Sequence, residues 1–223
     1  ERSVSLQRPF YLGTKEISNA ELRRWKASHS SSALRGQSLD MDQQPAVKVS
    51  WEDAALYCNW LSKREGLPQF YLLEAGVISG FNWDAHGYRL PTEAEWAWAA
   101  RIDTNGNSKI FPWANDLYPP MEVADNYADQ SASRFLTFTI ANYNDKTPVS
   151  AQTGSFKANH KGLYNMSGNV AEWVNDYYDV RPSRGDAVLD PTGPSTGTRH
   201  VIRGASWALG SRTELRLSYR EAG

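Results

Sequence analysis

The chain has 223 residues, which is long enough for one largish domain or two small ones with a hydrophobic core. Its 24 basic and 25 acidic residues leave a formal net charge of −1, so the composition offers no electrostatic case for binding nucleic acid or an anionic membrane. No apolar run approaches the ~20 residues of a membrane span, and we expect no direct membrane insertion of these residues.

The cysteine and histidine content narrows the possible chemistry further. Cys58 is the single cysteine, which excludes an internal disulfide, a thiolate zinc cluster and paired-thiol redox chemistry within these residues. The four histidines are scattered and lack the spacing of a preformed metal-binding face. Nine tryptophans and eleven tyrosines, together with sixteen glycines and eleven prolines, indicate a loop-rich fold pinned by large aromatic rings.

The first predicted elements are a strand and a helix. Residues 8–13 are predicted as a short strand that ends at a glycine. Ser18 is followed three residues later by Glu21, which is the spacing of a capping box, and this predicts a helix from about residue 19 to residue 26. Residues 29–44 are polar and without periodicity, so they are predicted to form a surface loop.

A second helix is predicted after a short strand at residues 47–49, from a second capping box with Ser50 as the cap and Asp53 three residues later. Apolar residues then recur at the spacing of one helix face, at Trp51, Ala54, Ala55, Cys58 and Leu61. Cys58 is therefore expected to be a buried small hydrophobic residue, because a reactive thiol needs exposure and a nearby positive charge.

Two short strands joined by a turn are predicted at residues 70–73 and 76–81. A third capping box pairs Thr92 with Glu95 and predicts a helix over residues 93–101. The two glutamates in its first turn, at 93 and 95, are explained by the helix dipole and the cap rather than by acid/base catalysis. From residue 105 to residue 154 regular structure is expected to fade.

Residues 162–173 contain two asparagines, a glutamate and two glycines within twelve positions, so this stretch is rich in side-chain oxygen atoms and its backbone is conformationally permissive. Calcium binds oxygen ligands, and Asn165 and Glu172 could supply side-chain oxygens while carbonyls near Gly168 and Val170 turn inward. The alternative is a helix start, with Asn169 as cap and Glu172 as its partner three residues later. On spacing alone the helix cap is favoured, because helix starts are far commoner than ion-binding loops.

A second oxygen-rich run lies at residues 124–129. It could form another ion loop closed by Asn142 or Asp145. The residues alone favour a solvated loop, because Asp and Asn form turns in any protein.

Taken together, the motifs resemble the formylglycine-generating enzyme (sulfatase-modifying factor) family. The resemblance rests on residues 87–96 (GYRLPTEAEW), 162–173 (GLYNMSGNVAEW), 203–207 (RGASW) and 216–220 (RLSYR), with Pro-Trp at 112 and Pro-Val at 148 between them. These strings follow the family's order over nearly the whole chain. The resemblance implies a single α+β domain over residues 1–223, loop-rich and related to the C-type lectin-like fold. It also implies that terminal segments of the full protein lie outside this sequence.

The resemblance favours calcium at the 162–173 loop. In the family, positions matching Asn165 and Glu172 hold calcium through side chains, and those matching Gly168 and Val170 hold it through main-chain carbonyls.

A second family calcium loop matches Asn126 and Tyr127. The aspartate of its return segment is missing, because that segment falls at residues 141–143. This second site therefore depends on Asn142 as a substitute.

The family's name-giving enzymes oxidise a substrate cysteine to formylglycine, using oxygen and copper(I) held by two cysteines. Those positions fall at about Leu209 and Glu214 in this chain, and copper(I) requires sulfur ligands, so we do not expect formylglycine generation. We expect instead a non-catalytic, calcium-stabilised binding domain that recognises an unknown protein or small molecule. The expected ligand cleft comprises Ser206, Trp207, Leu209, Glu214 and Arg216.

Two alternatives remain. One is an oxidative tailoring enzyme of the pyoverdine-maturation type with an unknown cofactor, and the other is a structural module of a larger bacterial envelope protein. Calcium argues for an extracytoplasmic location, in the periplasm or at the cell surface, because cytosolic free calcium is too low to fill a modest loop site.

Overall fold

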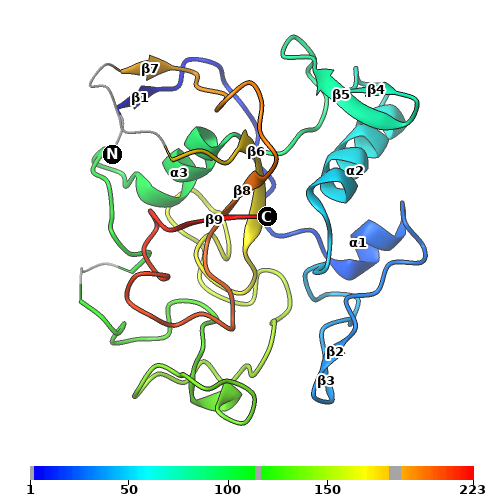
Figure 1. Ribbon diagram of the computed structural model, residues 1–223. Coiled ribbons are helices and arrows are strands. Elements are labelled where there is room, and N and C mark those ends of the chain that lie inside the picture. The colour runs from blue at the N-terminus through cyan, green and yellow to red at the C-terminus, as the bar shows by residue number, and fades with distance from the viewer. Residues whose placement is uncertain (1–2, 114–116, 181–186) are drawn as a thin grey trace.

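The computed structural model describes residues 3–113, 117–180 and 187–223 (Figure 1). Regular elements are few and short, and long loops connect them. In the described residues the helices are α1 (Asn19–Arg23), α2 (Trp51–Arg64) and α3 (Glu93–Arg101), with one 3-10 turn at Gln130–Ala132. The loop-rich α+β character expected from the sequence is confirmed.

The strands form four small sheets in the described residues. Strand β1 (Val4–Ser5) is parallel to β7 (Val188–Leu189). Two hairpins pair β2 (Ala33–Leu34) with β3 (Gln37–Ser38) and β4 (Tyr71–Glu74) with β5 (Val77–Phe81). The fourth sheet is antiparallel, with the strand order β6 (Glu172–Tyr177), β8 (His200–Arg203), β9 (Arg220–Ala222).

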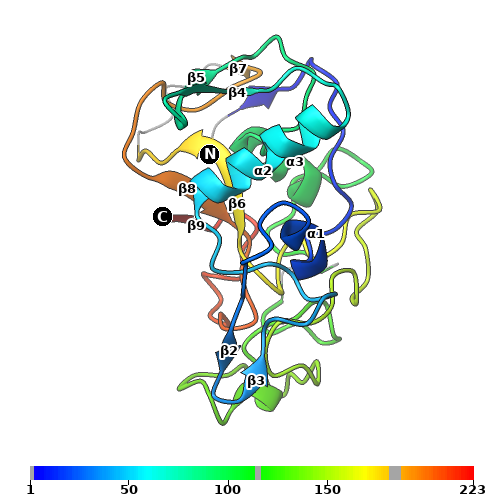
Figure 2. The same cartoon turned by 90° about the vertical axis from the view of Figure 1, so that its right-hand side faces the viewer.

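The β6–β8–β9 sheet lies between α2 and α3, as Figures 1 and 2 show from two directions. Successive side chains of a strand point to opposite faces of its sheet. Trp173 accordingly packs with the α2 cluster around Trp51, whereas Val174 packs with Trp96 of α3. The Trp51 Nε1 also donates a hydrogen bond of 3.0 Å to the carbonyl oxygen of Val174. The two helices thus pack against opposite faces of the sheet. The last two residues of the 162–173 loop are the first two residues of β6 and therefore lie between the helices.

The predicted capping boxes are confirmed at the first and third helices. Ser18 and Glu21 bond each other's backbone N–H groups at the start of α1, and Thr92 and Glu95 do the same for α3. Helix α3 has the predicted bounds, whereas α1 ends at Arg23, three residues earlier than predicted.

Ser50 caps α2 by accepting a hydrogen bond of 3.1 Å from the N–H of Asp53. The Asp53 carboxylate does not complete the box, because it pairs with Lys26 at 2.7 Å. Cys58 is buried on the inner face of α2 as predicted, and burial raises the pKa of its thiol to about 12.

Two predicted strands are wrong. Residues 8–13 have no strand partner in the described part of the chain, and the N–H groups of Gln7 and Arg8 donate to the carboxylate of Asp190 instead. Residues 47–49 are irregular because Lys48 adopts a left-handed backbone with φ of 59°. A strand exists only when another backbone pairs with it, and a local run of residues does not show that partner.

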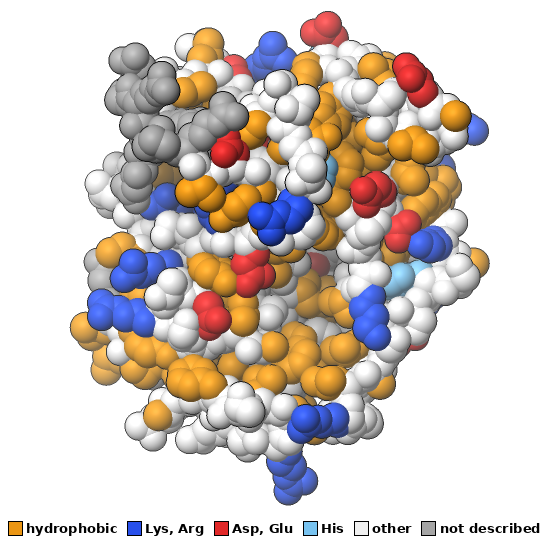
Figure 3. Space-filling view, in the orientation of Figure 1, with side chains coloured by type: hydrophobic (Ala, Val, Ile, Leu, Met, Phe, Trp, Pro, Cys, Tyr) orange, Lys and Arg blue, Asp and Glu red, His pale blue; other side chains and the backbone are white. Residues whose placement is uncertain are grey.

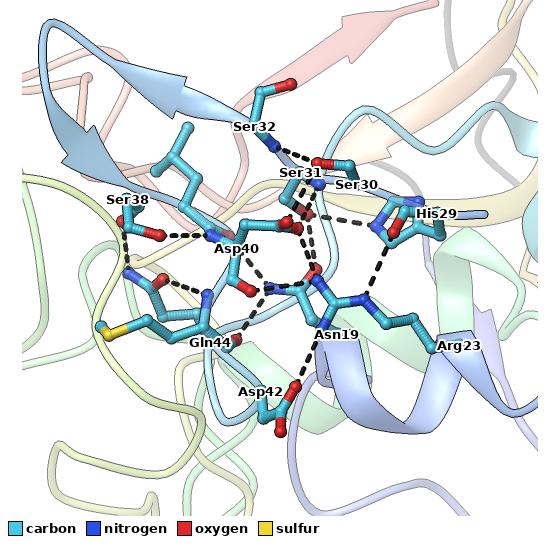
Figure 4. Close-up of polar contacts among 12 residues, drawn as sticks. Asn19, Arg23, His29, Ser30, Ser31, Ser32, Ser38, Asp40, Asp42 and Gln44 are labelled. Carbon is cyan, nitrogen blue, oxygen red and sulfur yellow. Dashed lines mark hydrogen bonds and ion pairs between the residues drawn. The ribbon is translucent and has the colours of Figure 1, made fainter. Parts of the chain in front are cut away.

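The polar segment at residues 29–44 is more than a surface loop. It contains the β2–β3 hairpin, and polar side chains anchor it from within, as Figure 4 shows. Asn19 donates to the carbonyl oxygens of Leu39 (2.9 Å) and Met41 (3.0 Å), and Ser31 donates to Asn19 at 2.6 Å. The polar composition of this segment indicated exposure to solvent. Polar side chains can equally be buried when their hydrogen bonds are satisfied, so composition alone does not distinguish the two cases.

The remaining element predictions hold. The β4–β5 hairpin occurs where it was predicted, and the described part of residues 105–154 contains only the 3-10 turn as a helix or strand. Residues 114–116 of that region lie outside the described residues. Among the described helices, none has the length and apolar character that crossing a membrane would demand. On the face shown in Figure 3, acidic and basic side chains are interspersed.

Candidate functional site

The two oxygen-rich loops at residues 124–129 and 162–173 pack directly against each other. The Asn165 side-chain amide donates to the carboxylate of Asp125 at 2.7 Å, and both residues are buried. Asn165 has a φ of 55°, a left-handed conformation that asparagine tolerates better than most residues. The structure therefore joins two loops that the sequence could only describe separately.

A second pair of asparagines completes the junction. The Asn126 side chain donates to Oδ1 of Asn169 at 3.0 Å, and the N–H of Asn169 donates to the carbonyl oxygen of Asn126 at 2.9 Å. Both residues are fully buried, and Oδ1 of Asn126 has no hydrogen-bond partner among the described residues. An unsatisfied buried oxygen is costly, so this atom requires an electropositive partner.

Gly168 permits the close approach of the two loops. A Cβ atom at this position would lie 2.8 Å from the carbonyl oxygen of Asn126, from the carboxyl carbon of Asp125 and from the ring of Tyr127. The Tyr127 hydroxyl is also 3.0 Å from the hydroxyl of Ser167. A glycine is needed at position 168 because residues of the 124–129 loop occupy the space into which any side chain there would project.

Glu172 is the first residue of β6, not part of a helix. The interpretation of Asn169 as a helix cap is therefore wrong, because pairing of β6 with β8 places Glu172 opposite Arg203 in a sheet. The Glu172 carboxylate accepts a hydrogen bond of 2.5 Å from Nε1 of Trp96. Burial raises the pKa of Glu172 to about 7, and the neighbouring charge of Asp125 contributes.

Sequence reasoning missed Glu16 as a member of this site. Its Oε2 accepts a hydrogen bond of 3.1 Å from the Asn169 side chain, and its Oε1 is buried without a partner among the described residues. Burial, followed by the charge of Glu172, raises the pKa of Glu16 well above its usual value. No local signal marks Glu16, because it lies before α1 and reaches the site only through the fold. Asp125 lies in an oxygen-rich run but was not singled out.

Glu16, Asp125 and Glu172 thus place one buried and two half-buried carboxyl groups within electrostatic range of one another. Burial raises the pKa of Asp125 to about 6, and none of the groups that most affect the pKa values of the three is a Lys or Arg. Calcium takes six to eight oxygen ligands, and it would offset this charge and satisfy the free oxygens. The residues present therefore fit a hard cation.

The carboxylates alone do not form a preformed metal site. In the described part of the chain, no three Asp, Glu, His or Cys side chains are close enough together to hold a metal by themselves. Calcium would need amide and main-chain oxygens as well, which is the kind of ligand set predicted from Asn165, Gly168, Val170 and Glu172.

The predicted second calcium loop is less complete. Asn126 and Tyr127 are buried, but Asn142 lies exposed in a turn with φ of 61°. The N–H of Tyr127 donates instead to the carboxylate of Asp145 at 3.0 Å, and burial raises the pKa of Asp145 to about 7. Asp145 was the other candidate for closing this loop, and it is the one that the fold brings to Tyr127.

The predicted ligand cleft lies along one loop, but part of it has a structural role. The Glu214 carboxylate accepts hydrogen bonds from the N–H groups of Gly210 (3.3 Å) and Ser211 (2.9 Å). Leu209 packs against the buried cluster that includes Phe111. The other three predicted cleft residues are half-buried or exposed, namely Ser206, Trp207 and Arg216.

The fold is that of formylglycine-generating-enzyme-like proteins. Treponema denticola variable protein 1 superposes with a TM-score of 0.72 at 25% identity, over 93% of this chain and 76% of that one. PvdO from Pseudomonas aeruginosa superposes with a TM-score of 0.67 at 24% identity, over 99% of this chain and 76% of that one.

The sequence comparisons define the family. Residues 1–222 match the family model of the sulfatase-modifying factor enzyme 1-like domain, and the chain belongs to this family. It is 30% identical to the chaperone protein LppX of Paenibacillus barcinonensis, over 98% of this chain and 76% of that protein. It is 31% identical to the mouse formylglycine-generating enzyme (76% of this chain, 37% of that protein) and 30% identical to the mouse inactive C-alpha-formylglycine-generating enzyme 2 (73% and 37%). The chain thus spans little more than a third of the length of these two mouse proteins.

Proposed function

We propose that this chain is a non-catalytic, calcium-stabilised binding domain that recognises a protein or small-molecule ligand. The observation that carries the calcium part concerns the carboxyl groups of Glu16, Asp125 and Glu172, because no Lys or Arg is among the groups that most affect their pKa values. Buried carboxylates cost free energy unless they are paired or bind a metal. A calcium ion between the two loops would repay that cost.

In this proposal the side chains of Asn165 and Glu172 and the carbonyl oxygens of Gly168 and Val170 hold the ion, and Glu16 adds a carboxylate nearby. The ion would join the 124–129 loop to the 162–173 loop, whose end forms the start of β6. Because calcium would bind this arrangement and not the unfolded chain, it would raise the stability of the whole domain by mass action.

The non-catalytic part rests on the two positions that match the copper-binding cysteines. Leu209 is an apolar side chain packed against a buried cluster, and the Glu214 carboxylate holds its own turn. Neither position offers the sulfur that copper(I) requires. The similarity to both a formylglycine-generating enzyme and an inactive one supports the view that this family fold also serves without that activity.

We place the ligand contact on the 206–216 loop, where Trp207 is partly exposed and Arg216 is exposed. Tryptophan and arginine are among the residues most enriched at the energetic centres of binding surfaces. We also propose an extracytoplasmic location, because a site of this kind fills at the calcium concentrations found outside the cytosol.

Metal analysis of the purified protein, followed by thermal melts in EGTA and in calcium, tests the proposal. We expect about one calcium ion per chain, a lower melting temperature in EGTA, and recovery with calcium but not with magnesium at the same concentration. At a calcium concentration 100 times Kd the stabilisation would be about 2.7 kcal/mol. A melting temperature that EGTA leaves unchanged would overturn the calcium site.

The alternative of an oxidative tailoring enzyme of the pyoverdine-maturation type has its own outcome in the same analysis. Stoichiometric iron or copper, with oxygen consumption that is lost when the metal is removed, would overturn the non-catalytic proposal.

A further inference from the structure

His29 is a buried residue, 9% exposed, at the start of the polar segment formed by residues 29–44 (Figure 4). Its backbone N–H donates to the carbonyl oxygen of Lys26 at 2.9 Å, and its own carbonyl oxygen accepts a hydrogen bond of 3.3 Å from Nε of Arg23. Its ring lies against Ser31, with 3.1 Å between Nε2 and the hydroxyl oxygen. His29 therefore connects α1 and the turn after it to the segment that contains the β2–β3 hairpin.

The hydrogen bonds of Ser31 decide which ring nitrogen of His29 carries the hydrogen atom. The side-chain amide of Asn19 is fixed in orientation, because its N–H groups donate to two backbone carbonyl oxygens. The Ser31 hydroxyl donates its one hydrogen to Oδ1 of Asn19 at 2.6 Å and accepts the N–H of Val47 at 2.9 Å. The oxygen of Ser31 can then only accept from the ring, so Nε2 of His29 carries the hydrogen and Nδ1 does not.

The charged groups that face His29 are already paired with one another. Arg23 of α1 pairs with Asp40 at 2.7 Å, and Lys26 pairs with Asp53 of α2 at 2.7 Å. The Asp40 carboxylate accepts two further hydrogen bonds, from a serine hydroxyl and from a backbone N–H. A protonated His29 would therefore find no unpaired carboxylate among these groups.

A second proton on His29 would go to Nδ1, which has no hydrogen-bond partner among the described residues. Burial is the main factor that lowers the pKa of His29 below its ordinary value of 6.5. The carboxylates of Asp40 and Asp53 oppose this effect, and the two neighbouring cations, Arg23 and Lys26, add to it. The closed segment thus favours the neutral ring, whereas an opened segment would let the ring take up a proton and be hydrated.

The direction of the pH effect follows from this difference. The stability that neutral His29 gives the segment is complete above pH 6.5, and it is lost as the pH falls below that value.

The same segment also holds residues 150–153. Nε2 of Gln44 donates to the carbonyl oxygen of Ser150 at 2.6 Å, and the N–H of Thr153 donates to the carbonyl oxygen of Gln43 at 2.9 Å. The hydrogen bonds of the segment therefore extend from His29 at one end to residues 150–153 at the other.

We propose that His29 makes residues 29–44 an acid-sensitive element, which is closed while the ring is neutral and opens when the ring takes up a second proton on Nδ1. None of the residues of this element belongs to the proposed calcium centre.

Nuclear magnetic resonance of the whole domain tests the protonation state directly. Long-range proton–nitrogen correlation spectra at pH 7.5 should show the hydrogen of His29 on Nε2, and the ring should titrate below pH 6.5. A hydrogen on Nδ1 at pH 7.5, or a titration at or above pH 6.5, would overturn the proposal.

Hydrogen exchange, measured in calcium and corrected for the intrinsic effect of pH on the exchange rate, tests the opening. We expect residues 29–44 to lose protection severalfold between pH 7.5 and pH 5, whereas α3 should not. His29→Gln should remove this loss, because the glutamine amide can still donate to Ser31 but does not titrate. His86→Gln, at an exposed histidine, is the matched control and should keep the loss.

Equal protection of residues 29–44 at both pH values would contradict the proposal, as would a loss that persists in a folded His29→Gln variant. If that variant does not fold, the titration and the exchange of the unmodified protein still decide the question, because both must change in the same pH range.

Discussion

The indole Nε1 of Trp96 lies 2.5 Å from Oε2 of Glu172, and this hydrogen bond ties the middle of α3 to the first residue of β6. It orients the carboxylate that is proposed to hold calcium. The orientation of a metal ligand depends on hydrogen bonds that it accepts from residues outside the metal site. A change in α3 at Trp96 should therefore affect the proposed calcium site.

Trp96→Phe should therefore weaken both the fold and calcium binding. The phenyl ring keeps part of the packing but cannot donate to Glu172, and losing a hydrogen bond to a charged group costs about 1.5–3 kcal/mol. Urea unfolding and calcium titration measure the two effects. Trp98→Phe is the matched control on the same helix, because Trp98 is 44% exposed, and equal calcium affinity in the two variants would contradict the role of Trp96.

Glu172→Gln should remove the dependence of stability on calcium. In calcium the variant should melt below the unmodified protein, because one charged ligand is lost. In EGTA it should be at least as stable, because the uncompensated buried charge of Glu172 is gone. Glu122→Gln, at an exposed carboxylate, is the control and should behave like the unmodified protein in both conditions. A variant that still responds to calcium would rule out Glu172 as a ligand.

The pH dependence of stability should differ with and without calcium. In EGTA, burial holds the pKa of Glu172 at about 7 against an ordinary value of 4.5, so the folded state keeps a proton that the unfolded state releases. The free energy of unfolding should then fall as pH rises from about 4.5 to about 7, by an amount on the order of 3 kcal/mol for Glu172 alone. Glu16 and Asp125 act in the same direction, since burial raises the pKa of each.

Bound calcium should remove most of this loss, because it favours the ionised carboxylates. Asp176, whose pKa burial raises to about 7, contributes under both conditions and cancels in the comparison. Thermal melts from pH 5 to pH 7.5 in EGTA and in calcium check the prediction. Parallel curves in the two conditions would mean that no cation binds the cluster.

Cys58→Ser should reduce stability by about 1–3 kcal/mol without changing calcium binding, because it places a more polar hydroxyl group in the aromatic cluster of α2. The native thiol should also resist iodoacetamide, since burial raises its pKa to about 12 and the thiolate is the reactive form. Denaturant unfolding and labelling before and after denaturation measure these effects. Rapid labelling of the folded protein would disprove the core position.

Asn142→Ala should leave the calcium stoichiometry unchanged, because Asn142 is exposed in a turn, and should lower the melting temperature only slightly, because alanine fits its φ of 61° less well than asparagine does. Asn165→Ala should lower both, since Asn165 is buried at the loop junction. Native mass spectrometry and melts compare the pair. Loss of one of two calcium ions in Asn142→Ala would show that the second family site is filled after all.

The features that could be predicted from the sequence are those decided within a few residues. Thr92 and Glu95 cap α3 because their side chains reach backbone groups one turn away, whatever the rest of the chain does. The face of α2 that includes Cys58 follows from helical spacing in the same way. The strands at residues 8–13 and 47–49 were wrong because a strand requires a partner that local sequence does not specify.

The candidate site divides along the same line. The sequence by itself determined the oxygen-rich Asn165–Glu172 motif, including the glycine between them, and the absence of sulfur at Leu209 and Glu214. The tertiary structure alone decided that Glu172 begins a strand, because pairing with β8 overrides a spacing that suits a helix cap equally well. It also decided that Glu16 and Asp125 join Glu172, since burial and charge between distant loops exist only once the chain has folded.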